Sequence, residues 1–286
     1  MARTRGLRRL FASFVFGLGD LIWMPGHNPR RRAPRDMQNY RHGYPDKSPK
    51  PNLLFYQNKI RFEPDGEYID YIHERWCNEY ETLEMNHNFI QWLFPLRERG
   101  VNWLATPLTL SEIELMKKDK KVMARILKSY KLMLGFYGIV LVDADTGMVA
   151  RAEDNWEDRF YNLNNHTHNS LRITRILKCL GEMGYEKLQA PLVRFFLEET
   201  LCNGNLPNLK ESALDYFMFT VKEKKERQKL VHFAWMNYEP QEMFIWGPVD
   251  KLRKFNPLPQ DAESKWEPDV PGEVKVQIDS EVSGSL

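Results

Sequence analysis

The sequence of 286 residues lacks the short motifs that identify most nucleotide-binding and hydrolytic enzymes. It contains no GxGxxG or GxxxxGK[ST] loop for phosphate, no GxSxG nucleophile turn and no HExxH zinc motif. The carboxylate pairs in the chain also lack the geometry of general acid and base groups, because adjacent helical residues point about 100° apart. We therefore expect no enzyme, no cofactor and no metal.

The chain has few cysteines, and their spacing does not indicate pairs. Cys77, Cys179 and Cys202 are odd in number and far apart, and no CxxC spacing occurs. Each lies within an apolar pattern typical of a helix. This usage predicts buried, reduced thiols and a reducing compartment rather than a disulfide framework.

Long apolar runs are also missing. The nearest approach is residues 10–24, which Asp20 interrupts and which are shorter than the roughly 20 residues that span a bilayer. The order of a basic start and an apolar run resembles a secretory signal, the Arg-rich start resembles a mitochondrial leader, and the two together resemble an interfacial helix. Residues 1–34 are thus a basic, partly apolar arm: a targeting segment, a disordered arm, or a membrane contact through residues 10–24.

The charge of the chain is uneven although its net value is only +2. Residues 1–42 hold nine arginines against two aspartates, and the tail from residue 256 holds seven acids against two lysines. A composition of 42% hydrophobic and 13% aromatic residues supplies a core between these flanks. We divide the chain into the arm 1–34, a Pro-rich linker 35–51, a folded domain 52–250 and a disordered acidic tail 251–286.

Helical periodicity dominates the predicted domain. The predicted fold is mainly α, a single multi-helix globular domain with one small β-hairpin at residues 139–150. We expect residues 53–62 to be extended, Ser111 to cap a helix with Glu114 in a capping box, and Gly184 to end a helix. The other predicted helices cover residues 67–83, 122–137, 155–163, 170–183, 186–202, 212–221 and 230–235.

One block, residues 86–103, is too apolar to stay solvated and too short to span a bilayer. It places Phe89, Trp92 and Phe94 close together before Pro95 ends the run. Such a block must enter the core or form the wall of a pocket.

Two groups of polar residues have both a structural and a functional interpretation. His166 and His168 are the one close histidine pair, and a polar loop before a helix capped by Asn169 or Ser170 explains them better than a metal site. The basic candidates lie on a helix side, in a charged run and in the linker. They are Arg172, Arg175 and Lys178; Lys222, Lys224, Lys225 and Arg227; and Arg30, Arg31 and Arg32. A solvated surface is one interpretation, and a strip for an acidic partner, nucleic acid or import factors is the other.

Long strings of the sequence resemble the conserved domain of the opioid growth factor receptor family. They occur in the family order between residues 35 and 250: RDMQNYRHGYPD, NLLFYQNKIRF, NHNFIQWLFPLRERGVNW, LMLGFYGI, RFYNLN, HNSLRITRILKCLGEMGYE, QAPLVRFFLEETL, SALDYFMFTV, LVHFAW and FIWGP. Residues 1–34 depart from the family, whose head is acidic.

The resemblance implies a non-classical receptor that binds the pentapeptide Met-enkephalin and restrains cell growth. It also implies a nuclear and perinuclear location, with membrane association as a further expectation and the nuclear import machinery as a partner. The alternative function is an intracellular helical scaffold that binds protein or nucleic acid through its basic helix faces. Nucleic acid is the less favoured partner, because glutamates interrupt the basic run at residues 222–227.

A zwitterionic pentapeptide with two aromatic rings needs a carboxylate, a cation and apolar slots, preferably in a pre-formed pocket. Acidic, basic and aromatic residues cluster around the apolar block. The predicted ligand-binding residues are Glu84, His87, Trp92, Phe94 and Arg97.

Overall fold

The computed structural model describes residues 50–255, and the predictions for the arm, for residues 35–49 of the linker and for residues 256–286 of the tail lie outside this range. Residues 251–254, predicted to belong to the disordered tail, instead end the helix Val249–Lys254. The α-helices are α3 (Pro51–Tyr56), α4 (Ile69–Arg75), α5 (Tyr80–Met85), α6 (Ile90–Leu93), α7 (Leu110–Lys118), α8 (Lys120–Phe136), α9 (Trp156–Asn165), α10 (His168–Met183), α11 (Gln189–Leu197), α12 (Lys210–Ser212), α13 (Met218–Thr220), α14 (Lys224–Met236) and α15 (Val249–Lys254). Two strands are present in this range, β1 (Ile139–Leu141) and β2 (Val149–Arg151). Shorter turns complete the helical series: π-helical Glu198–Cys202 and Ala213–Phe217, and 3-10 Glu186–Leu188, Pro207–Leu209 and Gln241–Met243. The predicted mainly α fold is confirmed.

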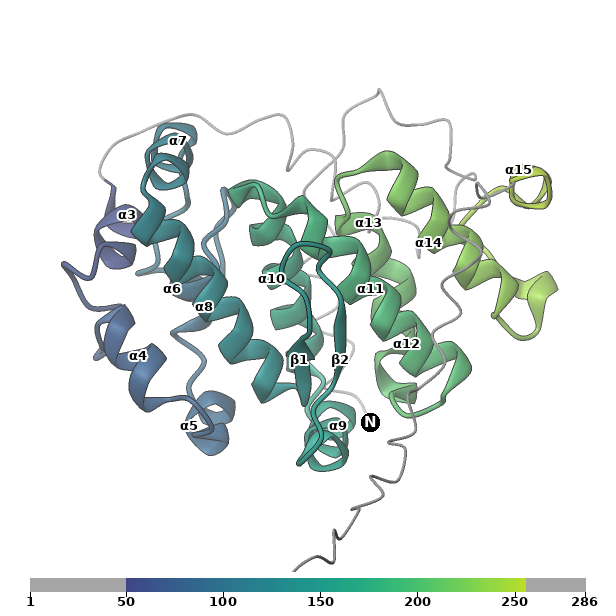
Figure 1. Cartoon of the computed structure of the whole chain (residues 1–286), viewed down its shortest axis with the longest axis horizontal. Helices are drawn as coiled ribbons and strands as arrows, with labels where there is room; N and C mark the ends of the chain where they lie inside the picture. The colour runs from purple at the N-terminus through teal and green to yellow at the C-terminus, as the bar shows by residue number, and fades with distance from the viewer. Residues whose placement is uncertain (1–49, 256–286) are drawn as a thin grey trace, which may run out of the picture.

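Helix α10 is the central helix of the domain. In Figure 1, α8, α10, α11 and α14 follow one another across the molecule, with β1 and β2 in front of them. Most of α10 is buried, including the apolar stripe through Ile173, Ile176 and Leu180. A helix that is buried on more than one side forms a core rather than a cover. Gly184 ends it with φ of 85°, which confirms the predicted glycine stop.

The predicted hairpin is confirmed, with its first strand one residue shorter than predicted and its second strand displaced by one residue towards the C-terminus. β1 and β2 pair antiparallel, with Val140 opposite Ala150. At the turn, the Asp143 carboxylate accepts hydrogen bonds from the Asp145 backbone and the Thr146 hydroxyl, while Gly147 takes φ of 81°. The hairpin packs on α8 and α11, which supplies the support that two isolated strands lack.

The helix predicted for residues 67–83 is wrong as one element. α4 ends at Arg75, and α5 begins at Tyr80 after a turn in which Asn78 takes φ of 69°. Asparagine tolerates this left-handed conformation better than most residues. The apolar stripe nevertheless predicted burial correctly, since Ile69, Ile72 and Leu83 are all buried.

Two local predictions before α8 are also wrong. Residues 51–56 form helix α3 instead of an extended segment, with Pro51 in the first turn, where proline costs no hydrogen bond. The cap of α7 is Thr109 rather than Ser111, because its hydroxyl accepts the Glu112 N–H at 3.2 Å. Glu112 itself is buried and accepts hydrogen bonds from the Asn52 side chain and the Leu53 N–H, so α3 is fixed on α7.

The prediction that all three thiols are buried holds for Cys179 alone. Cys77 is exposed because it lies in the break between α4 and α5, and Cys202 is exposed at the end of its π-helical turn. Burial raises the pKa of the Cys179 thiol far above its usual range, so this thiol stays protonated and inert. All three cysteines are free.

Candidate functional site

The five predicted ligand residues do not converge on one site. Trp92 is 2% exposed, and its indole N–H donates to the Glu63 carbonyl oxygen at 3.1 Å. Phe94 is fully buried. Both rings therefore belong to the core and are not exposed at the surface.

Arg97 is also withdrawn from solvent, at 7% exposure, and forms an ion pair with Glu182 of α10. Its Nε lies 3.2 Å from Oε2 of Glu182, and its Nη2 donates to Oε1 at 3.3 Å. A guanidinium held in this way by a buried carboxylate is not offered to the carboxylate of a peptide. Arg97 joins the 86–103 block to the central helix.

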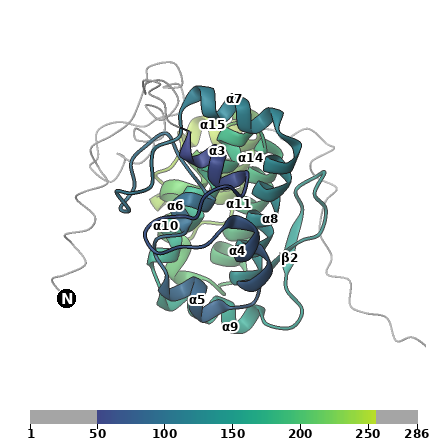
Figure 2. The ribbon, with the colours of Figure 1, turned by 90° about the vertical axis from the view of Figure 1, so that its left-hand side faces the viewer.

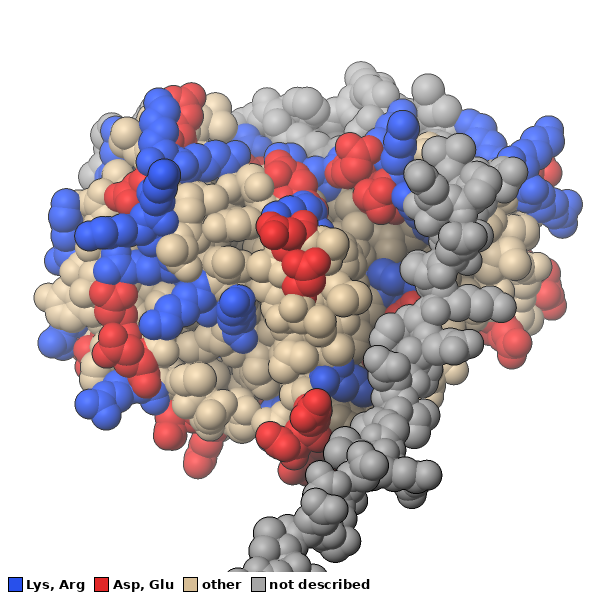
Figure 3. Space-filling model, in the orientation of Figure 1, with Lys and Arg blue, Asp and Glu red and all other residues tan. Residues whose placement is uncertain are grey.

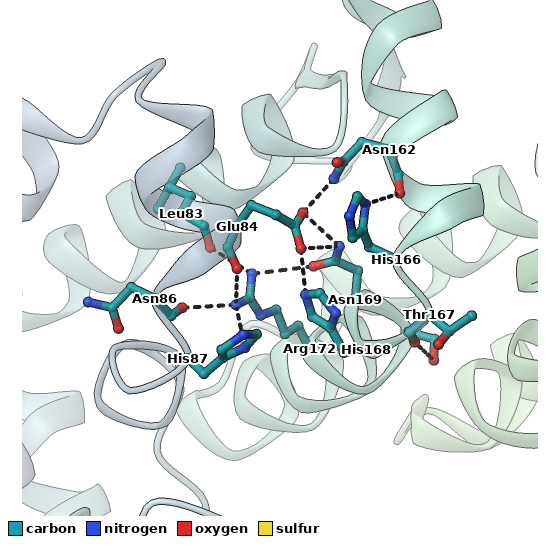
Figure 4. A network of polar contacts seen from close by, with 11 residues as sticks. Leu83, Glu84, Asn86, His87, Asn162, His166, Thr167, His168, Asn169 and Arg172 are labelled. Carbon is teal, nitrogen blue, oxygen red and sulfur yellow. Dashed lines mark hydrogen bonds and ion pairs between the residues drawn. The ribbon is translucent and has the colours of Figure 1, made fainter. Parts of the chain in front are cut away.

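Glu84 and His87 do lie close together, at the edge of a polar network between α5, α9 and α10 (Figure 4). The Glu84 carboxylate accepts hydrogen bonds from the Asn162 side chain at 2.6 Å and the Asn169 side chain at 3.2 Å. Nε2 of His168 lies 2.6 Å from its other oxygen. The network is built from residues nearly 80 or more positions apart in the chain, which explains why spacing did not reveal it.

Burial and hydrogen bonding shift the pKa of the Glu84 carboxyl in opposite directions. Burial acts to raise it, but the hydrogen bonds from His168, Asn162 and Asn169 stabilise the charged form and lower the pKa to about 2. The pKa of His87 is lowered by burial and by the charge of Arg172. Near neutral pH this pair is an ionised carboxylate and a neutral imidazole, and Glu84 has no proton to donate.

Arg172 is the residue that sequence reasoning placed most incorrectly. It is 4% exposed rather than on a solvated face. Its guanidinium donates to the carbonyl oxygens of Leu83, Glu84 and Asn86 at 2.8, 3.2 and 2.9 Å, and it lies 3.3 Å from Nδ1 of His87. These carbonyls end α5, so Arg172 caps that helix from another element.

The remaining basic candidates are divided between buried and exposed positions. Lys178 is buried and pairs with Glu98 at 2.6 Å, and Arg175 is partly buried and donates to the Phe94 carbonyl at 2.7 Å. The predicted solvated strip on α10 is therefore wrong, because the helix packs against residues 83–98 on that side. Lys222, Lys224 and Lys225 are exposed and Arg227 is half-buried, near the start of α14. Arg30, Arg31 and Arg32 lie outside the described residues.

The histidine pair also differs from its predicted role. His168 lies in α10 and pairs with Glu84, while Nδ1 of His166 lies 3.1 Å from the Asn162 carbonyl. Asn169 and Ser170 lie within α10 and do not cap it. Across residues 50–255, no group of three or more His, Cys, Asp or Glu side chains is arranged to hold a metal ion.

A feature that sequence reasoning missed is the loop at residues 99–103. Val101 is 86% exposed and Trp103 79% exposed, whereas Asn102 between them is buried. The Asn102 side chain donates to the Glu63 carbonyl at 2.7 Å and accepts the Leu104 N–H at 3.0 Å. The buried amide fixes the loop, so two large apolar side chains are held in solvent. A lone polar residue between two apolar ones has no period that would reveal this.

A small cavity lies among α8, α10 and α11. Its volume is about 10 Å³, and apolar and tyrosine side chains line it. It can hold no more than a water-sized group. No helix within the described range is long and apolar enough to cross a membrane.

The helical domain thus holds its polar clusters in internal contacts and exposes one fixed apolar loop. Comparison with known proteins identifies its family. The family model described as "Opioid growth factor receptor (OGFr) conserved region" matches residues 46–253, well over half of the chain. The chain belongs to this family.

Several relatives share half or more of their aligned residues with the chain. The opioid growth factor receptor of Mus musculus is 56% identical over 232 residues, covering 79% of this chain and 36% of that protein. The Homo sapiens receptor is 56% identical over 232 residues, covering 79% and 34%. Opioid growth factor receptor-like protein 1 of Mus musculus is 50% identical over 245 residues, covering 84% and 51%.

The chain thus spans about a third to a half of the length of these relatives. No solved structure matches the chain.

Proposed function

We propose that this chain is a non-enzymatic receptor of the opioid growth factor type, which binds an opioid pentapeptide and restrains cell growth. The observation that carries the proposal is membership of the receptor family across residues 46–253, which includes nearly all of the folded domain. Its proposed location is the nucleus and perinuclear cytoplasm. The nuclear import machinery would recognise the basic cluster Arg30, Arg31 and Arg32. Membrane contact through residues 10–24 is part of the same proposal.

The titratable groups support a binding role rather than catalysis. The carboxylate with the most strongly lowered pKa, Glu84, is enclosed by hydrogen-bond donors, and the buried thiol of Cys179 is held protonated. A catalytic acid, base or nucleophile needs a pKa near the working pH and access to substrate. Neither group meets both requirements.

The 99–103 loop is the surface that best suits a small aromatic peptide. Trp103 offers an exposed ring for stacking, Val101 offers apolar contact, and the exposed Arg99 offers a cation for the peptide carboxylate. The loop is fixed before binding, which lowers the entropy lost on association. The Asn102 side chain also lies 3.5 Å from the carbonyl of Asn88, the residue after His87.

Calorimetric titration of the full chain with Met-enkephalin, beside a scrambled peptide, tests the proposal. We expect saturable binding of the native sequence alone, and at least a tenfold loss of affinity in Trp103→Ala. Tyr161→Ala is the matched control, because Tyr161 is an aromatic residue 73% exposed on α9. Absence of binding to the folded wild-type chain would refute the receptor function, whereas equal binding by Trp103→Ala would refute only the loop.

The alternative, an intracellular scaffold, is favoured by the exposed lysines at the start of α14. Lys224 and Lys225 lie in its first turn and are exposed. Binding of an acidic protein or nucleic acid there would weaken steeply as salt rises. A peptide held by aromatic stacking would show a much smaller salt effect, so titration at two ionic strengths distinguishes the functions.

A further inference from the structure

Six exposed lysines gather at the end of α7 and along the outward side of α8. Figure 3 shows Lys and Arg side chains gathered over these two helices, at the left of the view. We call them the lysine face: Lys117, Lys118, Lys120, Lys121, Lys128 and Lys131. Within residues 50–255, no carboxylate forms an ion pair with any of these six side chains.

The carboxylates nearby are fewer than the lysines: they are Asp70, Asp119 and Glu114, which is exposed on α7. Asp70 is bound in a bidentate pair by Arg125, with distances of 2.7 and 2.6 Å. Asp119 is occupied by the backbone N–H groups of Lys121 and Val122, which it caps. The lysine face therefore keeps a strong positive charge, and like charges one helical turn apart repel each other. An anionic partner would relieve this repulsion.

We propose that the lysine face docks on an anionic membrane surface. The first argument is the presence of exposed apolar groups beside the charges. Leu115 lies one turn before Lys118 on the same side of α7, and both are exposed, as is Leu110 at the start of the helix. Leucines beside lysines suit the boundary between lipid headgroups and acyl chains, whereas a nucleic acid backbone offers little to an exposed leucine.

The second argument is the chemistry of the cations. Each charge of the face is an ammonium, a hydrated point charge that suits a diffuse anionic surface. Arg125, the one arginine of α7 and α8, is committed to Asp70 and to the Tyr56 carbonyl oxygen. These two helices thus hold no uncommitted arginine for a base edge and no exposed aromatic ring for base stacking, the groups that nucleic-acid binding uses.

The third argument is where the N-terminal segment joins the domain. α3 begins at Pro51 and is fixed to α7 through Glu112 and to α8 through Arg125. The chain before residue 50 therefore joins the domain beside the lysine face, and its sequence includes the apolar residues 10–24 and nine arginines. An apolar segment and a polybasic surface are individually weak membrane signals that become strong in combination.

Vesicle flotation of the full chain tests the proposal. The probes are vesicles of phosphatidylcholine alone and vesicles with 30% phosphatidylserine, about physiological in charge. We expect binding to the charged vesicles only. Lys121→Glu, Lys128→Glu and Lys131→Glu together should lower the partition coefficient at least 30-fold, since each basic residue near the surface contributes about a fivefold factor.

The matched control carries the same change of charge at the other side of the domain. Lys224→Glu, Lys225→Glu and Lys254→Glu replace three exposed lysines on α14 and α15. We expect this control to reduce partition less than threefold, with circular dichroism confirming that both variants are folded. Equal loss in the two variants would overturn the proposal, because net charge alone would then explain binding. Unchanged binding of the lysine-face variant would overturn it as well.

A parallel arm separates membranes from nucleic acid. The wild-type chain is titrated with a fluorescent DNA duplex at the same ionic strength as the vesicles. Tighter binding to the duplex, lost in the lysine-face variant, together with no binding to charged vesicles would overturn the membrane assignment in favour of nucleic acid. Vesicle binding that falls as salt rises and that depends on the leucines, shown by Leu115→Ser, supports it.

Discussion

Nη1 of Arg172 donates a 2.8 Å hydrogen bond to the carbonyl oxygen of Leu83, 89 positions earlier in the chain. The same guanidinium also reaches the carbonyls of Glu84 and Asn86. One buried side chain of α10 thus satisfies the carbonyl groups at the end of α5, which water cannot easily reach. The positive charge of the guanidinium also interacts favourably with the partial negative charge at that end of the helix.

Replacing Arg172 should therefore destabilise the domain. We expect Arg172→Ala to lower the free energy of unfolding by about 3–4 kcal/mol, because several buried acceptors lose their donor. Arg172→Lys should recover only part of this loss, since one ammonium cannot match the planar guanidinium. Urea denaturation measures the change. Arg253→Ala, at an exposed position of α15, is the control and should change stability little. A loss below 1 kcal/mol in Arg172→Ala would contradict the capping role.

Glu84 should be equally important to the junction of α5, α9 and α10. Glu84→Gln keeps the shape of the side chain but removes the charge that pairs with His168. We expect a loss of about 2–4 kcal/mol, measured by chemical denaturation at pH 7. Glu81→Gln, on the exposed side of the same helix, should have almost no effect.

The lowered pKa of Glu84 also predicts acid sensitivity. A carboxyl with a folded pKa of about 2 and an unfolded value of 4.5 stabilises the fold fully above 4.5, and this contribution is lost as the pH falls towards 2. The Glu84→Gln variant should lack this part of the acid transition. An unchanged slope of stability against pH between 4.5 and 2 would refute the assignment.

His73 should produce a second pH effect at higher pH. It is 5% exposed, its Nε2 lies 2.8 Å from the Ser129 hydroxyl, and burial together with the charge of Lys128 lowers its pKa to about 4. Between pH 6.5 and 4 the His73 imidazole is protonated in the unfolded chain but neutral in the folded chain. The free energy of unfolding therefore falls as the pH drops from 6.5 to 4.

The variant His73→Met tests this effect. Between pH 6.5 and 4 it should lose up to about 3 kcal/mol less stability than the wild type. His166→Gln, at an exposed histidine, should keep the wild-type slope. Thermal denaturation across the pH series provides the measurement, and equal slopes in His73→Met and wild type would disprove the role of His73.

Substitution of two tryptophans eleven positions apart should change stability by very different amounts. Trp92→Ala should cost about 3–5 kcal/mol, because it empties a core site and leaves the Glu63 carbonyl with one donor fewer. Trp103→Ala should change stability by less than 0.5 kcal/mol, because its ring is exposed. Denaturation of both variants in the same buffer makes the comparison, and a large loss in Trp103→Ala would show that the ring packs on the domain.

The relation of sequence to structure differs between the helices and the site. Periodic apolar stripes predicted which faces are buried, as in α8 and α10, because burial depends on spacing along one element. The break between α4 and α5 escaped prediction because the apolar stripe continues through it, while Asn78 turns the backbone. The cap of α7 was displaced by two residues for a similar reason, since Thr109 and Ser111 are both capable caps and only packing selects one.

By itself, the sequence determined the helical class, the hairpin, the glycine stop at Gly184 and the family of the protein. These follow from local spacing or from long shared strings, which need no knowledge of partners in space. Tertiary structure decided the polar chemistry. The sequence alone does not distinguish a buried basic residue of a helix from an exposed one. Arg172 is buried against α5, whereas Lys121 is exposed to solvent on α8. The difference arises because the cost of burying a charge depends on which groups, distant in the chain, fold around it.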